Sequence, residues 1–199
     1  MVKDVLTRAI PESQCFLMGS FPLRTYLPDS DIDIAVLVPE SPKAQSDTQT
    51  TLRKILDALY CAAMQPEPQE AGHTLRNISF VNAKTPVVRC TVGNVDLDLT
   101  VNQIGSLGAI TFLEEADRFI GKQHLFKRSL LLLKLWLSTE AVTYAGRPLL
   151  GAKSGMFSSY AVSVMVLYLF NAKREDTLNH PFEVLRAFLE TYSRFPWDS

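Results

Sequence analysis

Two short segments of the chain alternate aspartate with aliphatic residues, and this alternation constrains what each can form. They are Asp31–Val38 (DIDIAVLV) and Val95–Val101 (VDLDLTV). Successive side chains of a β-strand point to opposite faces, so aspartates at positions i and i+2 share one face and the aliphatic residues share the other. Aspartate is disfavoured in strands, and its repetition in two separate segments argues against accident. The sequence therefore predicts a sheet with an acidic face and an apolar face that packs on a helix.

The residues around these two strands predict a first half of mixed structure. Leu52–Met64 has apolar residues at helical spacing, whereas Leu75–Val81 has the composition of a short strand. Pro86–Val92 is separated from the second acidic strand by Gly93-Asn94, which favours a β-hairpin. Two segments rich in proline and polar residues are predicted to be exposed loops, 39–48 and 65–72.

The second half of the chain has a different pattern, with long segments that are apolar on most sides. The helices expected there are Thr111–Ser138, Ser158–Phe170 and Phe182–Phe195. Strands followed by helices indicate an α+β chain. We therefore expect one domain of strands and helices at residues 1–103 and a helical domain at residues 104–199.

Composition and charge indicate the cellular compartment of the chain and the kinds of partner to expect. The formal net charge is −1, whereas broad electrostatic binding to nucleic acid calls for a strongly basic chain. The three cysteines, Cys15, Cys61 and Cys90, fit neither a disulfide framework nor a zinc pattern, which favours an intracellular compartment, cytoplasm or nucleus. The longest apolar stretches, Leu130–Leu137 and Ala161–Phe170, are too short to span a bilayer, so no membrane partner is expected.

The paired aspartates predict a site for divalent cations. Asp31 and Asp33 share one strand face. Two carboxylates placed so close together repel each other unless a cation lies between them. Mg²⁺ takes oxygen ligands, often one or two carboxylates together with substrate phosphates. Asp96 and Asp98 share a face of the second strand, and one of them can supply a third ligand for a two-metal phosphoryl-transfer site. The alternative is a half-exposed sheet whose outer face carries aspartates without a ligand.

The spacing of these residues matches a known family. Gly19-Ser20, ten further residues, Asp31-x-Asp33 and a later strand aspartate resemble the DNA polymerase β-like nucleotidyltransferase superfamily. The resemblance is closer to one branch, the poly(A) polymerases and terminal uridylyltransferases, and to its plant-like members in particular. It rests on GSFPLRTYLPDSDID, VDLDLTVNQ, FLEEADRFIGKQHLFKRSLLLLKLW, SGMFSSYAVSVMVLYLF and YSRFPWD. It implies a polymerase β-like palm followed by part of an all-helical poly(A) polymerase-type central domain.

The resemblance implies roles for the residues of the first motif. Gly19 and Ser20 form a turn that opens a helix and contacts the incoming triphosphate through backbone N–H groups and a hydroxyl. By this resemblance, Asp31 and Asp33 correspond to the first two ligands of Mg²⁺ (or Mn²⁺) and are expected to be catalytic.

The third catalytic aspartate of the family precedes a segment like I-S-F-N. Leu99-Thr100-Val101-Asn102 follows Asp98, so Asp98 is the expected third metal ligand. Asp96 is the alternative, because it shares the same strand face.

The resemblance also implies a nucleotide-binding role for four residues of the helical half. Lys134 in LLLLKLW matches a family lysine that contacts phosphate, although a lysine with its amine at the helix edge is the alternative. Ser158, Ser159 and Tyr160 match an S-S-Y motif in which a serine touches phosphate and the tyrosine stacks on the nucleobase. The alternative there is an N-capping serine followed by a core tyrosine. Relatives often carry a second lysine where this chain has Ser138.

A cluster of basic residues lies near the middle of the chain. Lys122, His124, Lys127 and Arg128 can face RNA phosphates, or form a solvated helix face, which we favour.

Taken together, the resemblance implies a template-independent RNA 3′-terminal nucleotidyltransferase. It would add nucleotides from ATP or UTP to an RNA 3′ end and release pyrophosphate. A catalytically inactive or truncated paralogue that acts as a binding or scaffold protein is the alternative, and a nucleotidyltransferase acting on a small molecule or protein is a third. In relatives a loop that reads the nucleobase follows soon after the position of Ser199, so we expect the helical domain to be incomplete at its C-terminus.

Overall fold

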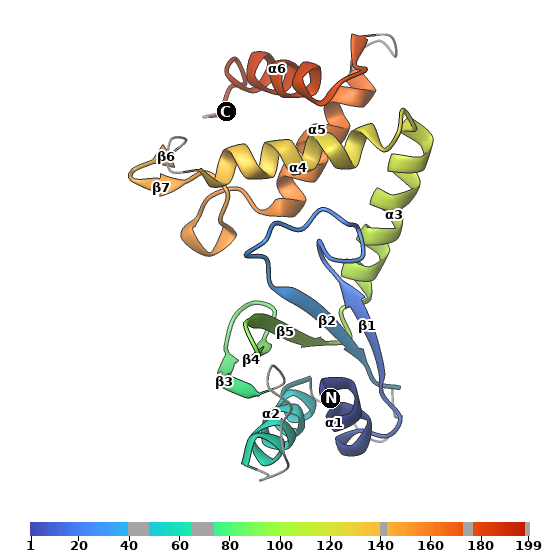
Figure 1. The fold of residues 1–199 in the computed structure, drawn as a ribbon, viewed down its shortest axis with the longest axis vertical. Coiled ribbons are helices and arrows are strands. Elements are labelled where there is room, and N and C mark those ends of the chain that lie inside the picture. The colour runs from blue at the N-terminus through green and yellow to red at the C-terminus, as the bar shows by residue number, and fades with distance from the viewer. Residues whose placement is uncertain (40–47, 65–73, 140–142, 173–176, 198–199) are drawn as a thin grey trace. The chain divides into compact units, whose positions relative to one another are not determined.

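The structure is a computed structural model that describes residues 1–39, 48–64, 74–139, 143–172 and 177–197 (Figure 1). The chain divides into two compact units. Unit 1 comprises Met1–Pro22 and Asp29–Ile110, and unit 2 comprises Leu23–Pro28 and Thr111–Ser199. The domain boundary expected between residues 103 and 104 stays a prediction.

Unit 1 is built from a sheet, two helices and the start of a third helix, Ile104–Ile120. In chain order its elements are α1 (Val2–Ala9), β1 (Gln14–Met18), β2 (Ile32–Leu37), α2 (Thr48–Met64), β3 (Leu75–Val81), β4 (Val87–Val92) and β5 (Val95–Val101). The sheet has the strand order β1-β2-β5-β4-β3. Strands β2 and β5 are parallel, whereas the other neighbouring pairs are antiparallel. The two acidic strands are therefore direct neighbours at the middle of the sheet.

One face of this sheet carries the core of unit 1. Val36 of β2 and Leu99 of β5 are fully buried there, and they pack with Leu6 of α1 and with Leu52 and Ile55 of α2. Figure 1 shows α1 and α2 beside each other against the sheet. Because side chains alternate along a strand, burial of this aliphatic face leaves the aspartates on the other face.

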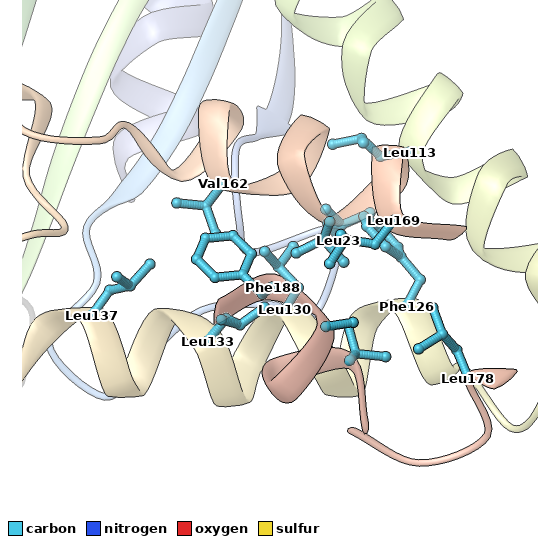
Figure 2. Packing of buried hydrophobic residues seen from close by; sticks show 13 residues of the cluster. Leu23, Leu113, Phe126, Leu130, Leu133, Leu137, Val162, Leu169, Leu178 and Phe188 are labelled. Carbon is cyan, nitrogen blue, oxygen red and sulfur yellow. The ribbon is translucent and has the colours of Figure 1, made fainter. Parts of the chain in front are cut away.

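Unit 2 is mainly helical. Its elements are most of α3 (Ile104–Ile120), α4 (Leu125–Ser138), the short strands β6 (Thr143–Tyr144) and β7 (Arg147–Pro148), a 3₁₀ turn (Ala152–Ser154), α5 (Ser159–Ala172) and α6 (Pro181–Tyr192). Helix α4 buries Phe126, Leu130, Leu133 and Leu137, which recur at the spacing of one helix face. Figure 2 shows these four side chains packed with residues of α5 and α6 and with Leu23.

Most of the expected elements are confirmed, and one helix is corrected. The mixed α+β architecture, both acidic strands, the hairpin and the helices at α2, α5 and α6 are present. The single helix expected over Thr111–Ser138 is wrong, because the chain breaks into α3 and α4. The break has a backbone cause: Gly121 and the three residues after it, 122–124, all have positive φ angles between +46° and +65°, which ends a right-handed helix. The two expected loops lie almost wholly outside the described residues.

Two further findings bear on the setting of the chain. Among the described residues, no helix is both long enough and apolar enough to cross a membrane. Cys61 is exposed, Cys15 is partly buried and Cys90 is buried, and all three are free thiols.

Candidate active site

The centre of the candidate site is a pair of aspartates on adjacent strands. Asp33 of β2 lies directly opposite Asp98 of β5 in the parallel register. Adjacent strands are about 4.8 Å apart, and opposed residues project from the same face of a sheet. Asp98 is largely buried and Asp33 is half-buried. Two carboxylates from strands far apart in sequence are therefore presented together on the acidic face.

Gly19 lies against the first of these carboxylates. It follows β1, whose last residue Met18 pairs with Asp33, and its φ angle is +71°. A Cβ atom built on Gly19 would overlap the Asp33 Oδ2 atom and lie 3.0 Å from its Cγ. Glycine is therefore required twice, for the left-handed backbone and for the space that the carboxylate occupies. The expectation that Gly19 and Ser20 open a helix is wrong, because the chain forms turns from Gly19 to Arg24.

The Asp98 carboxylate is held by an arginine. Arg89 of β4 lies opposite Asp98 in the antiparallel hairpin. Its Nε donates to Oδ1 at 2.7 Å and its Nη2 donates to Oδ2 at 2.6 Å, so the pair is bidentate. These hydrogen bonds, together with the neighbouring carboxylates, raise the pKa of the Arg89 guanidinium.

The pairing of Arg89 with Asp98 was not predicted from the sequence, although the register of the hairpin implies it. A hairpin with the two-residue turn Gly93-Asn94 places residue 92 opposite 95, and counting back pairs residue 89 with 98. The predicted hairpin thus already contained the Arg89–Asp98 pair.

The register also separates the two candidates for the third metal ligand. Asp96 pairs with Thr91, whose hydroxyl donates to Asp96 Oδ1 at 2.7 Å. Asp98, in contrast, is the residue directly opposite Asp33. This arrangement favours Asp98 over Asp96, as the family motif does.

No assembled metal cage is found in the part of the chain that the structure describes. In these residues no group of three His, Cys, Asp or Glu side chains lies close enough together to hold a metal ion. Asp31 lies immediately before β2, and both Asp98 oxygens accept from Arg89. The oxygen-only donor set of Asp31, Asp33 and Asp98 nevertheless suits a hard divalent cation. The metal assignment stays a prediction.

Asn102 fixes the strand pair that carries these aspartates. Its side-chain Oδ1 accepts the Val38 N–H at 2.9 Å, and its own N–H donates to the Val36 carbonyl at 3.0 Å. It thus continues the β2–β5 pairing past the end of β5, with a positive φ angle of +53°. Asparagine tolerates a positive φ angle better than most residues do. The asparagine at the end of the motif that follows Asp98 therefore has a structural role.

Lys134 has a structural partner within unit 2. Lys134 is 3% exposed, and its Nζ donates to the Thr25 carbonyl at 2.6 Å. Thr25 is itself buried. The alternative, in which the Lys134 amine reaches solvent at the edge of the helix, is therefore wrong. Thr25 belongs to Leu23–Pro28, the segment between the Gly-Ser turn and Asp31. Lys134 ties this segment to α4.

The S-S-Y motif begins α5. Ser158 accepts the Ala161 N–H at 3.0 Å through its Oγ and so caps the helix. Ser159 is exposed, and Tyr160 is 53% exposed rather than part of the core. An exposed ring at a helix N-terminus is available to a ligand, which suits the predicted stacking role.

The basic cluster is exposed as expected at Lys122, His124 and Arg128, whereas Lys127 is buried. Lys127 is largely buried, and its Nζ contacts Glu114 at 2.6 Å and Asp117 at 3.6 Å. The Nδ1 atom of His124 lies 2.6 Å from the fully buried Asp117 carboxylate. Lys122 donates to the Leu178 carbonyl at 2.8 Å. Lys122, His124 and Lys127 therefore hold the turn between α3 and α4. The charge pattern of the sequence did not indicate this structural role.

Comparison with known proteins agrees with the motifs. Residues 1–114 match the family model described as poly(A) RNA polymerase, mitochondrial-like, central palm domain. The chain belongs to this family. Residues 120–199 match the PAP/OAS1 substrate-binding domain. The resemblance to the poly(A) polymerase and terminal uridylyltransferase branch is thereby confirmed.

Individual relatives point the same way. The chain is 26% identical over 181 residues to Poly(A) RNA polymerase GLD2-B of Xenopus laevis, covering 87% of this chain and 31% of that protein. It is 29% identical over 174 residues to human Poly(A) RNA polymerase GLD2, covering 84% of this chain and 32% of that protein. The chain thus spans about a third of the length of these curated relatives.

Solved structures confirm the fold. The polymerase core of TRAMP, an RNA surveillance complex, superimposes with a TM-score of 0.71 at 16% identity, covering 99% of this chain and 57% of that one. Cid1, whose RNA terminal uridylyl transferase activity has been studied structurally, superimposes with a TM-score of 0.62 at 21% identity, covering 85% of this chain and 46% of that one. The α+β polymerase-type fold predicted from the sequence is confirmed.

Proposed function

We propose that this chain is the catalytic part of an RNA 3′-terminal nucleotidyltransferase. It adds nucleotides without a template, from ATP or UTP, and releases pyrophosphate. The observation that carries the proposal is the pairing of Asp33 with Asp98 on adjacent parallel strands, with Gly19 packed against the Asp33 carboxylate. Membership of a poly(A) RNA polymerase family and similarity to GLD2 proteins support it.

We propose that Asp31, Asp33 and Asp98 hold Mg²⁺ or Mn²⁺. Such ions, when bound, lower the pKa of an attacking 3′-hydroxyl and stabilise the charge of the leaving pyrophosphate. The three aspartates supply only oxygen donors, which divalent ions of this kind prefer. Gly19 keeps the space beside Asp33 open, so that the carboxylate keeps its position on the strand face.

The remaining residues of the proposed site bind the nucleotide. Gly19 and Ser20 offer backbone N–H groups and a hydroxyl to the triphosphate. Ser158 and Ser159 lie at the start of α5, where the helix dipole favours phosphate. Tyr160 stacks on the nucleobase, and such stacking is worth about 1–3 kcal/mol with little discrimination between bases.

Lys134 remains in the proposed site with a modified role. Its amine donates to the Thr25 carbonyl, and its match to the family lysine in LLLLKLW supports the phosphate contact. We propose that it positions the segment before Asp31 in addition to contacting phosphate.

Primer extension tests the proposal. The purified chain is incubated with a short labelled RNA, Mg²⁺ and each of the four nucleoside triphosphates in turn. We expect extension with ATP or UTP, and Asp33→Ala should abolish it. Asp57→Ala is the matched control, because Asp57 is an exposed aspartate on α2. Circular dichroism of both variants checks that each is folded.

A second candidate function is that of an inactive paralogue that binds a partner as a scaffold. One observation favours it: both Asp98 oxygens accept hydrogen bonds from Arg89. Under this alternative, nucleoside triphosphate with Mg²⁺ leaves the thermal stability of the chain unchanged and no primer is extended. The proposed enzyme instead shows thermal stabilisation by the triphosphate that requires Mg²⁺.

A further inference from the structure

Arg89 lies outside the family motifs and contacts the proposed site directly, through Asp98. Its side chain is 29% exposed and that of Asp98 is 11% exposed, so the pair is shielded from much of the solvent. Both carboxylate oxygens are used, at 2.7 Å and 2.6 Å. A fork of this kind fixes the plane of the carboxylate as well as its position.

The charges around this pair show why an arginine is needed there. Asp31, Asp96 and Asp98 all interact electrostatically with Arg89, and Asp33 lies directly opposite Asp98. Carboxylates placed this close together repel one another unless a cation is present. In the absence of a divalent ion, the guanidinium supplies that positive charge.

We propose that Arg89 is a positioning residue that holds Asp98 in the metal-free chain and competes with a divalent cation for it. The inference rests on the proposed function, since it takes Asp98 as a metal ligand. Arg89 stabilises the acidic face before the metal binds. A metal ion that takes an Asp98 oxygen must share it with the guanidinium or displace the guanidinium, and either arrangement weakens metal binding.

The direction of the effect follows from charge. A guanidinium and a divalent cation on the same carboxylate repel each other strongly in a partly buried setting. Removing the charge of Arg89 therefore tightens metal binding, while leaving Asp98 without its partner lowers the stability of the metal-free chain. A role for Arg89 in folding alone would lower stability and leave metal affinity unchanged.

Binding of Mn²⁺ to the whole chain, without RNA or nucleotide, tests this inference. Electron paramagnetic resonance measures free Mn²⁺ during the titration. We expect Arg89→Gln to bind Mn²⁺ at least about tenfold more tightly than the parent, and Arg89→Lys, which keeps the charge, to stay within about threefold of it. Arg76→Gln is the matched control, because Arg76 is an exposed arginine on β3 that donates to the Gly93 carbonyl.

A second measurement uses the parent chain and does not depend on a variant that folds. The Arg89 Nε–H donates to Asp98 in the metal-free structure, so its proton and nitrogen resonances report on this hydrogen bond. We expect these resonances to move as Mg²⁺ is titrated, whereas those of Arg76 stay in place.

The possible outcomes separate the inference from the function on which it rests. Parental Mn²⁺ binding with an unchanged or weaker affinity in Arg89→Gln would overturn the inference alone. Arg89 resonances that ignore saturating Mg²⁺ would do the same. If neither the parent nor Arg89→Gln bound Mn²⁺, Asp98 would no longer be a metal ligand, and the proposed function would fail with the inference.

Discussion

Substitution of Gly19 by alanine separates the catalytic geometry from general stability. The φ angle of Gly19 is +71°, and a left-handed backbone costs an ordinary L-residue about 1–2 kcal/mol. For a chain of this size, each kcal/mol lowers the melting temperature by about 2–4 °C, so a loss of about 2–8 °C is expected. The new methyl group would also overlap the Asp33 carboxylate and force it to move.

The effect on activity is expected to be much larger than the effect on stability. A displacement of about 1 Å at a catalytic group can cost about 100-fold in rate, so Gly19→Ala should lose at least that much primer extension. The matched control is Gly146→Ala. Gly146 has a similar φ angle of +74°, but no atom lies within 4 Å of the added Cβ.

Comparison of Gly19→Ala with Gly146→Ala separates a loss of stability from a loss of catalytic geometry. Differential scanning fluorimetry should show a lower melting temperature for both variants, whereas primer extension should fall in Gly19→Ala only. If Gly19→Ala extends RNA at the parental rate, the Asp33 carboxylate has no catalytic role in the position described above.

Three further results are expected. Lys134→Met should lower the free energy of unfolding in urea by about 1–3 kcal/mol, because a buried carbonyl loses its donor; stability equal to that of the exposed control Arg186→Met would leave Lys134 with no structural role. Burial, with nearby carboxylates, raises the pKa of Cys90 to about 11. At a pH near 8, iodoacetamide should therefore modify the exposed Cys61 well before Cys90, as mass spectrometry would show, and equal rates would contradict the burial. Two backbone N–H groups lower the pKa of the Glu183 carboxyl. The stabilisation that this group gives α6 is present above its unfolded pKa and is lost as pH falls through the lower folded value, so Glu183→Gln should weaken the acid dependence of the melting temperature.

Local patterns were enough to predict the central strands and the sheet face that carries their aspartates. The alternation in β2 and β5 identified the acidic face, and the Gly93-Asn94 turn identified the hairpin. These features depend on residues close together in sequence. The expected helices at α2, α5 and α6 were found for the same reason, since each carries its own apolar periodicity.

Contacts between distant segments were harder to predict. The β1 strand, Gln14–Met18, has no strong alternation, so its pairing with β2 and the approach of Gly19 to Asp33 were not expected. Helix α1, Val2–Ala9, is too short for its periodicity to stand out.

The break between α3 and α4 shows another limit of sequence patterns. Its left-handed turn depends on the buried Asp117, which contacts His124 and Lys127. Each of these charged residues suggests solvent exposure when it is considered alone. Only the folded chain shows that Lys127 and Asp117 are buried together, whereas Lys122, His124 and Arg128 are exposed as expected.

The most direct test of the central claim is to locate bound Mn²⁺ in a crystal of this chain grown with a nucleoside triphosphate. Anomalous scattering at the manganese edge identifies the ion independently of the protein. We predict a peak about 2.1 Å from carboxylate oxygens of both Asp33 and Asp98. Mn²⁺ bound at other residues, with these two carboxylates uninvolved, would contradict the account.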